Sequence, residues 1–294
     1  MWWTLADLPD QAGRTVVVTG ANSGPGLVTA RALAAAGASV ICACRDVAKD
    51  RAALAGLAGR LEVRSLDLAD LSSVAAFAAG FEGKIDVLIN NAGVVLPPKQ
   101  YTLGGFEMQF GTNYLGSFAL TAQLISRITD RVVSLSSLAH RVGRIRLDDP
   151  NWQRGYRRWL AYGLSKLADL MFAYEPQHRL REAGSPVRSV AAHPGYAATD
   201  LQSRTESVQD YLMGFLNKIV EHSAEVGALP TLYAATVLDL PGGSFVGPQR
   251  PGGLHGYPRP VGSSAASHDR TVQRKLWILS ERLTGARFSF ATLS

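Results

Sequence analysis

The stretch Thr19-Gly20-Ala21-Asn22-Ser23-Gly24-Pro25-Gly26 (residues 19–26) decides the fold of this chain. It follows a short apolar run at 15–19 and leads into an Ala-rich helical run at 26–36. Glycines let the backbone turn tightly and approach a pyrophosphate, and the start of a helix favours the negative charge of that group. A strand, a Gly-rich turn and a helix in this order predict a dinucleotide-binding unit, although a tight turn without a ligand would use the same residues.

The same rhythm continues along the chain, where apolar β-branched runs are followed by Ala-rich helical runs. The next pairs are 39–44 with 48–57 and 61–66 with 71–79. Further strands are expected at 85–89, 131–136, 187–192 and 244–246. Right-handed crossovers then give an α/β fold, a doubly wound Rossmann-type domain. Its mostly parallel seven-stranded sheet has the expected order 3-2-1-4-5-6-7, with helices on both faces.

Length and composition fit one globular domain spanning 1–294, because no repeat or long linker divides the sequence. The Gly/Pro-rich stretch at 241–260 is interpreted as a late loop, so that 241–285 forms a C-terminal loop and helix. The longest apolar stretches fall well short of the roughly 20 residues that a membrane span needs, and the first residues lack the features of a signal peptide. We therefore expect a cytoplasmic protein with no membrane partner; its state as a monomer or homo-oligomer is left open.

The distribution of charge argues against a nucleic-acid-binding protein, and the spacing of cysteines and histidines argues against a metal site. The net charge of +6 would suit an anionic partner, but the basic residues are scattered, so no nucleic acid partner is expected. Cys42 and Cys44 lie two residues apart in a predicted strand and point to one face, which favours buried, reduced thiols. His140 and His193 have no second ligand at metal spacing, so no metal site is expected.

The residue that follows the second predicted strand indicates which cofactor is bound. An acidic side chain at position 44 would hold a ribose 2′-hydroxyl, but Cys44 cannot. Arg45 instead offers a planar cation that suits a 2′-phosphate, which favours NADP(H). The alternative is a solvated Arg45 paired with Asp46 or Asp50.

Tyr162-Gly163-Leu164-Ser165-Lys166 opens a long helical run, so Tyr162 and Lys166 fall at i, i+4 on one helix face. A phenol with an ordinary pKa of about 10 is a poor acid or base at neutral pH unless a nearby cation favours the phenolate. Lys166 can supply that charge. Ser136 and Ser137 stand at the end of a predicted strand, where a hydroxyl can donate a hydrogen bond to a substrate carbonyl oxygen.

Together these motifs resemble the short-chain dehydrogenase/reductase family, from Arg14 to about Gly285. The family's other motifs follow in order as Asp67-Leu68, Asn90-Asn91-Ala92-Gly93, Asn113 and His193-Pro194-Gly195. The phrases Ala43-Cys44-Arg45-Asp46 and Leu138-Ala139-His140 resemble the branch that holds retinol dehydrogenases and WW-domain oxidoreductases. The chain is similar to a soluble member of that branch.

The resemblance implies a role for each matching position. Tyr162 would be the acid/base, Lys166 would lower the pKa of Tyr162 and bond the nicotinamide ribose, Ser137 would orient the carbonyl, and Asn113 would support a proton-relay water. The implied cofactor-binding residues are Gly20, Asn22, Ser23, Gly24, Pro25, Gly26, Arg45, Asp67, Leu68, Asn91, Ala92, Gly93, Tyr162, Lys166, Pro194, Gly195 and Thr199. The candidate substrate pocket comprises Val95, Leu96, Val142, Trp159, Tyr196, Tyr211 and Met213, under a lid at about 197–220.

Two prolines depart from the expected pattern. Pro25 stands where the family usually has an aliphatic residue, and it has no backbone N–H to offer a pyrophosphate, which predicts weakened cofactor binding. Pro176, inside the helical run after Lys166, predicts a kink because it cannot donate its backbone bond.

The leading hypothesis is an NADP(H)-dependent ketone or aldehyde reductase, or the reverse alcohol dehydrogenase, acting on a bulky apolar small molecule. The alternative is a dinucleotide-binding family member with a non-redox role, a sensor or a cyclase, which Pro25 alone supports. A third hypothesis, a nucleic-acid-binding protein, rests only on charge.

Overall fold

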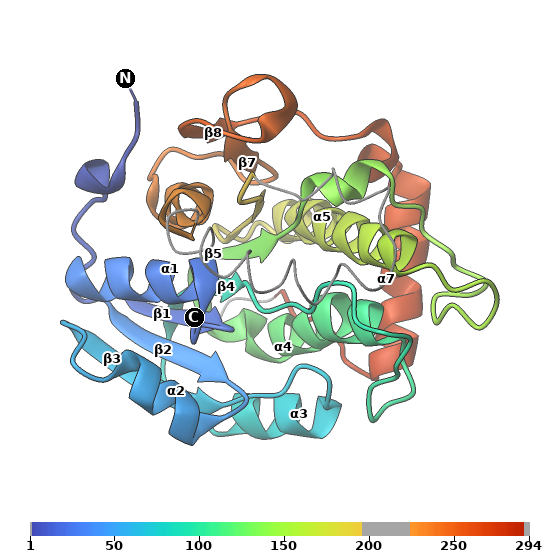
Figure 1. The fold of residues 1–294 in the computed structure, drawn as a ribbon, viewed down its shortest axis with the longest axis horizontal. Helices are drawn as coiled ribbons and strands as arrows, with labels where there is room; N and C mark the ends of the chain where they lie inside the picture. Colours follow the sequence, from blue (N-terminus) through green and yellow to red (C-terminus); the bar gives the residue numbers. More distant parts are fainter. Residues whose placement is uncertain (1, 196–223, 291–294) are drawn as a thin grey trace, which may run out of the picture.

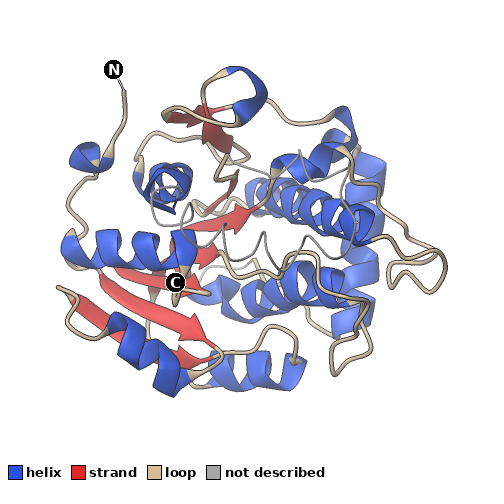
Figure 2. Ribbon diagram, viewed as in Figure 1, coloured by secondary structure: helices blue, strands red, loops and turns tan. Residues whose placement is uncertain are grey.

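The computed structural model describes residues 2–195 and 224–290. The sheet in this part of the chain has eight strands in the order β3-β2-β1-β4-β5-β6-β7-β8 (Figures 1 and 2). The strands are β1 Thr15–Thr19, β2 Ser39–Cys44, β3 Arg60–Ser65, β4 Ile85–Asn90, β5 Ile128–Leu135, β6 Arg188–Ala192, β7 Phe245–Pro248 and β8 Pro258–Pro260. The α/β class and the order of the first seven strands are confirmed, and those seven pair in parallel.

The predicted number of strands was one too low. The additional strand, β8, pairs antiparallel with β7 at the edge of the sheet. Its three residues, Pro-Arg-Pro, carry no apolar alternation, and proline is disfavoured within strands except at an edge. The strand is therefore created by its backbone pairing with β7, which a local pattern cannot predict.

Helices cover both faces of the sheet, as the doubly wound fold requires (Figure 2). Val17 of β1 packs into an apolar cluster with residues of α3, α4, α5 and α7, whereas Val16 and Val18 pack into a second cluster with α1, α2 and the helix of residues 224–236. This alternation follows from the two-residue period of a strand. The helices with printed bounds are α1 Gly24–Ala35, α2 Val47–Leu54, α3 Leu71–Ala79, α4 Gly116–Leu124, α5 Arg158–Glu182 and α7 Arg270–Thr284.

Helix α5 places the Tyr162–Lys166 pair against the sheet. It continues as one helix for six residues beyond Pro176, and a kink at this proline stays a prediction. An aromatic cluster holds α7 against α4 and α5: the ring centroids of Trp277 and Phe118 lie 5.0 Å apart, and those of Trp277 and Phe288 lie 4.4 Å apart. The segment predicted as a C-terminal loop and helix therefore supports the helices that carry the candidate site.

Candidate active site

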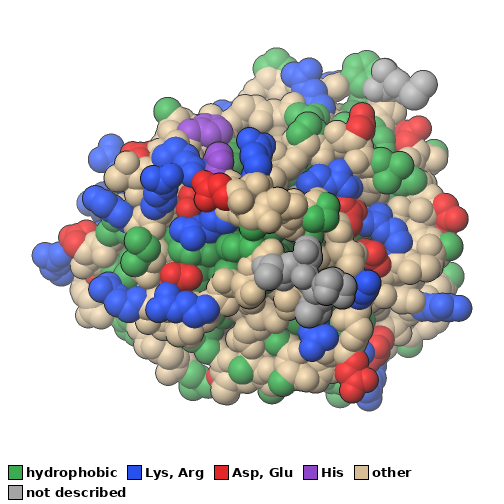
Figure 3. Space-filling view, turned by 180° about the vertical axis from the view of Figure 1, so that it is seen from behind, with side chains coloured by type: hydrophobic (Ala, Val, Ile, Leu, Met, Phe, Trp, Pro, Cys, Tyr) green, Lys and Arg blue, Asp and Glu red, His purple; other side chains and the backbone are tan. Residues whose placement is uncertain are grey.

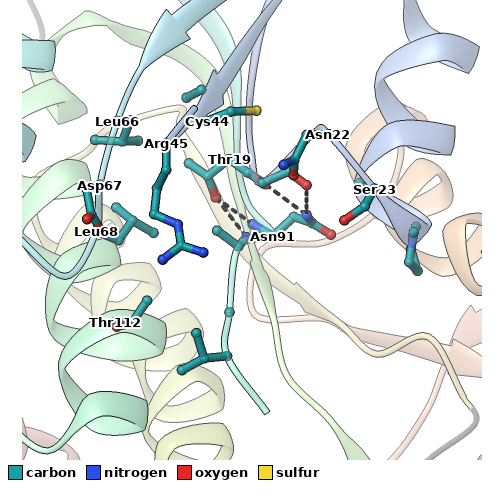
Figure 4. Close-up of a pocket in the computed structure, with 18 residues that line it drawn as sticks. Thr19, Asn22, Ser23, Cys44, Arg45, Leu66, Asp67, Leu68, Asn91 and Thr112 are labelled. Atoms are coloured by element: carbon teal, nitrogen blue, oxygen red, sulfur yellow. Dashed lines mark hydrogen bonds between the residues drawn. The ribbon is translucent and has the colours of Figure 1, made fainter. Parts of the chain in front are cut away.

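A cavity of about 360 Å³ opens where β1, β2 and β4 end, at the carboxyl edge of the parallel sheet (Figure 4). This is the edge at which doubly wound folds bind their ligands. Twelve predicted cofactor residues line it: Gly20, Asn22, Ser23, Gly24, Pro25, Gly26, Arg45, Asp67, Leu68, Asn91, Ala92 and Gly93. Thr19, Ala43, Cys44, Leu66, Val94 and Thr112 complete the lining and were not among the predicted site residues.

The Gly-rich turn is shaped by close backbone approach. A Cβ on Gly26 would lie 2.3 Å from Asn91 Nδ2 and 2.4 Å from the Gly20 carbonyl oxygen, so no larger residue fits there. Asn91 Nδ2 donates to the carbonyls of Thr19 and Gly20, at 2.8 and 3.2 Å, and Thr19 Oγ1 accepts from the backbone N–H groups of Asn91 and Ala92 (Figure 4). Asn91 therefore braces the turn from β4 in addition to lining the cavity.

The start of α1 faces the cavity with backbone donors. Ser23 is the N-cap and makes no side-chain capping bond, so it leaves the N–H groups of the first turn free for a ligand. Pro25 is the second helical residue and removes one of these donors, whereas Gly24 and Gly26 keep theirs. A helix start with free N–H groups favours an anion.

Arg45 extends into the cavity at the end of β2 (Figure 4). Within residues 2–195 and 224–290 it makes no ion pair. Neither carboxylate considered as its partner forms an ion pair with it: Asp46 Oδ1 accepts from the Lys49 N–H at 3.0 Å, and Asp50, which is buried, accepts from Asn22 Nδ2 at 2.8 Å through Oδ1. Arg45 is exposed and available to an anionic ligand.

Asp67, Cys44 and Cys42, which lie in or near this edge of the sheet, have surroundings that suit a structural role. Asp67 Oδ1 accepts from the Ala69 N–H at 2.9 Å, which fixes the chain after β3, and Asp67 also lines the cavity. Burial and the Asp50 charge raise the pKa of the Cys44 thiol to about 11. Burial likewise raises the pKa of Cys42, to about 12. Both thiols are buried and unpaired, in agreement with the expectation from their spacing.

Lys166 of helix α5 places its ammonium group next to Gly93 at the wall of the cavity. A Cβ on Gly93, which lines the cavity, would lie 3.7 Å from Lys166 Nζ. The Lys166 ammonium lies 5.9 Å from the centroid of the Tyr162 ring, as the i, i+4 spacing predicts. Ser136 Oγ donates to the Lys166 carbonyl at 2.8 Å, which ties the end of β5 to this turn of α5.

The hydroxyl of Ser137 accepts a hydrogen bond within the protein, whereas that of Ser136 donates one. Ser137 caps the short 3₁₀ helix Leu138–Arg141, where its Oγ accepts from the Ala139 N–H at 3.2 Å. As an acceptor it keeps its own proton for another partner, whereas the proton of Ser136 is committed to Lys166. His140 Nε2 accepts from the Ser264 N–H, so Nδ1 carries the proton and donates to the Ser137 carbonyl at 2.7 Å.

Asn113 lies in a π-helical turn, Phe110–Leu115, a rare geometry that often marks functional sites. Its Oδ1 accepts from the Val94 N–H at 2.7 Å. Its Nδ2 donates to the Val94 carbonyl and to Ser165 Oγ, each at 3.1 Å. Asn113 thus connects the segment after β4 to the helix of the Tyr162–Lys166 pair.

Sequence reasoning missed Asp169, whose Oδ2 lies 2.9 Å from Lys166 Nζ. Burial lowers the pKa of Lys166, but attraction to Asp169 and, less strongly, to Tyr162 together raise it above its ordinary value. Burial raises the pKa of Asp169 to about 6, against the lowering effect of Lys166. Tyr162, Lys166 and Asp169 are spaced i, i+4 and i+7, a signal that could have identified the carboxylate.

The remaining predicted residues in the described part of the chain are the Pro194-Gly195 pair and four residues of the candidate substrate pocket. Pro194 and Gly195 follow β6. Pro194 Cβ and Pro25 Cγ each lie 3.4 Å from where a Cβ on Gly227 would be, so Gly227 of the helix of residues 224–236 packs against both prolines. Within the candidate substrate pocket, the Trp159 ring packs edge-on at 6.3 Å from that of Tyr162, while Val95 and Val142 are 62% and 52% exposed. The Leu96 N–H donates to Gln109 Oε1, and none of these four lines the cavity.

Tyr196, Thr199, Tyr211, Met213 and the predicted lid at 197–220 lie outside the described residues. In the part of the chain that is described, no group of three His, Cys, Asp or Glu side chains could hold a metal ion. Burial lowers the pKa of His193 to about 4, and its Nδ1 accepts from the Gly195 N–H.

Within residues 2–195 and 224–290, no helix is both long and apolar enough to cross a bilayer. Figure 3 shows Lys and Arg side chains scattered over one face, with Asp and Glu between them.

The family model of short chain dehydrogenases matches residues 14–210. Human retinol dehydrogenase 13 is 40% identical over 93% of this chain and 85% of its own, and zebrafish (Danio rerio) polyprenol dehydrogenase is 36% identical over 96% and 90%. The crystal structure of an uncharacterized protein from Mycobacterium paratuberculosis is similar with a TM-score of 0.89 and 53% identity, covering 98% of this chain and all of the other.

The matched residues contain the Gly-rich turn, Asn113, the serine pair and the Tyr162–Lys166 pair. The chain therefore belongs to the short-chain dehydrogenase family, whose members are oxidoreductases that use nicotinamide cofactors, and it resembles the retinol dehydrogenase branch of that family.

Proposed function

We propose that this protein transfers hydride between NADP(H) and the carbonyl or secondary alcohol of a bulky apolar substrate, with Tyr162 as acid/base. The observation that carries the proposal is the buried Lys166 ammonium, which lies one helical turn from Tyr162 and beside a cavity with anion-binding features. A cation in this position stabilises the negative charge that forms on the phenol oxygen when the tyrosine gives up its proton.

The residues that line the cavity support a dinucleotide as its ligand. Gly26 lets the turn pack tightly against Asn91 and the Gly20 carbonyl, and the N–H groups of Gly24 and Gly26 at the start of α1 would supply hydrogen bonds to a pyrophosphate. When bound, the nicotinamide supplies or accepts the hydride. The ammonium of Lys166, within reach of the Gly93 side of the cavity, would hold the nicotinamide ribose.

NADP(H) is favoured over NAD(H) because of Arg45. In the described residues its guanidinium has no competing carboxylate, and it is exposed at the strand end where a doubly wound fold reads the adenosine ribose. A planar guanidinium suits a 2′-phosphate, with which it can form two parallel hydrogen bonds.

In the reducing direction, Tyr162 would donate the proton that the carbonyl oxygen requires as hydride reaches its carbon. The free proton of the Ser137 hydroxyl would hydrogen-bond that oxygen and hold it in place. Asn113, fixed by Val94 and Ser165, would keep a water beside Lys166 through which the tyrosine regains its proton. The reverse sequence oxidises an alcohol.

The substrate class is inferred from the relatives. Retinol and polyprenol, named in the matching dehydrogenases, are apolar isoprenoid alcohols, so we propose a substrate of similar size and polarity. Trp159, packed edge-on against Tyr162, supplies an aromatic surface next to the proposed acid/base.

The test mixes purified protein with NADPH or NADH and a panel of bulky aldehydes and ketones while the reduced-nicotinamide absorbance is followed. We expect turnover with NADPH that Tyr162→Phe abolishes. Binding of NADPH without turnover of any member in either direction would favour a sensor or cyclase, the alternative that the missing N–H of Pro25 supports.

A further inference from the structure

A carboxylate is buried beside the proposed proton-transfer residues, and the role proposed above does not use it. Asp169 Oδ2 and the Leu135 carbonyl oxygen each lie 2.9 Å from Lys166 Nζ, so two of the three ammonium protons are engaged by groups from α5 and β5. The side chains of Lys166 and Asp169 are only 8% and 6% exposed. Water can therefore contribute little to the stabilisation of either charge.

The surroundings of Asp169 isolate this pair. Among the described residues, its ion pair is with Lys166. Tyr114, which lies in the π-helical turn, is the titratable group that faces it from another element, and the Tyr114 hydroxyl is hydrogen-bonded to Ser280 of α7 at 2.7 Å. Glu175, further along α5, has its own partners in Arg179 and Arg270.

We propose that Asp169 is a positioning residue for the Tyr162–Lys166 pair. Its carboxylate supplies the countercharge that keeps the buried Lys166 protonated, and together with the Leu135 carbonyl it fixes Nζ one turn from Tyr162. The effect on catalysis rests on the function proposed above, whereas the link between Asp169 and the Lys166 charge is a property of the protein without cofactor.

The pKa directions give the link a pH signature. Burial raises the pKa of Asp169 to about 6, so acidification through that pH protonates Asp169 and removes the countercharge from Lys166. Burial by itself lowers the pKa of Lys166, and Asp169 is the largest of the groups that raise it, ahead of Tyr162. Asp169→Asn should therefore remove the transition near pH 6 and lower the Lys166 pKa by at least about one unit.

The first experiment follows Lys166 directly in the protein without cofactor. The chain has six lysines, so ¹³Cε-lysine labelling gives a simple spectrum in which the signal missing from Lys166→Met identifies Lys166. In the wild type we expect this signal to shift near pH 6 and its ammonium to titrate above the ordinary lysine value. In Asp169→Asn the first shift should disappear and the second should move to lower pH.

Glu175→Gln is the matched control, because Glu175 is equally buried in the same helix and paired with other cations. It should change neither transition, while Asp169→Glu should retain both. A folded Asp169→Asn protein with the wild-type Lys166 titration would overturn the proposal. If that variant does not fold, a wild-type Lys166 signal without a transition near pH 6 overturns it equally.

The second experiment measures kcat/KM against pH with NADPH, because this ratio reports the pKa values of the free enzyme. We expect Asp169→Asn to lose the change near pH 6 and to shift the alkaline limb to lower pH by at least about one unit. A wild type that turns over no substrate contradicts the proposed function, and the NMR titration then still decides the role of Asp169.

Discussion

Replacing Arg45 with Ala tests how the protein selects its cofactor. Arg45 is exposed, lines the cavity and has no ion pair in the described part of the chain, so its removal leaves no buried carboxylate unpaired. The expected loss is therefore that of its contact with the 2′-phosphate alone. A charge-assisted hydrogen bond contributes roughly 1.5–3 kcal/mol, which corresponds to about ten- to a hundredfold in affinity for NADPH. NADH, which lacks the phosphate, should bind almost as before.

The assay is calorimetric titration of wild type, Arg45→Ala and Arg45→Lys with both cofactors at one fixed salt concentration. Arg45→Lys keeps the charge but not the planar fork, so an intermediate NADPH affinity is expected. Arg51→Ala removes an equal charge from an exposed position on α2 outside the cavity and controls for the general field of the protein. Equal losses for NADPH and NADH, or a loss in Arg51→Ala as large as in Arg45→Ala, would refute the reasoning.

Three further variants test the remaining assignments. Tyr162→Phe should lower turnover by about 10²–10⁴-fold with near-normal cofactor binding, and a variant that keeps more than about a tenth of the rate with chemistry limiting would exclude Tyr162 as the acid. Lys166→Met should weaken NADPH binding and alter the pH–rate profile together; unchanged values for both would remove both roles. Pro25→Ala restores an N–H at the second position of α1 without enlarging the side chain near Gly227. Because a hydrogen bond to a charged phosphate is worth about ten- to a hundredfold in affinity, calorimetry should show tighter NADPH binding within that range. Unchanged affinity there would mean that the missing donor is compensated, and the sensor or cyclase alternative would lose its support.

The parts of this protein that could be predicted were those set by neighbouring residues. Apolar β-branched runs that alternate with Ala-rich helical runs, together with the Gly-rich turn, led to the α/β class and the order of seven strands, because crossovers between parallel strands are almost always right-handed. The i, i+4 spacing placed Lys166 beside Tyr162 because a helix fixes that distance whatever surrounds it. Strand β8 escaped prediction because it exists only through its pairing with β7.

The sequence by itself determined which chemical groups reach the sheet edge: a tight turn that only Gly26 can complete, an arginine after β2, and a tyrosine and a lysine on one helix turn. Tertiary structure decided how those groups are partnered. The buried Asp50 accepts from Asn22, 28 residues away in sequence, and Lys166 is held by the Leu135 carbonyl, 31 residues away. The physical reason is that burial removes water as the default partner, so a charged or polar group takes whichever partner the packed elements bring within hydrogen-bond reach.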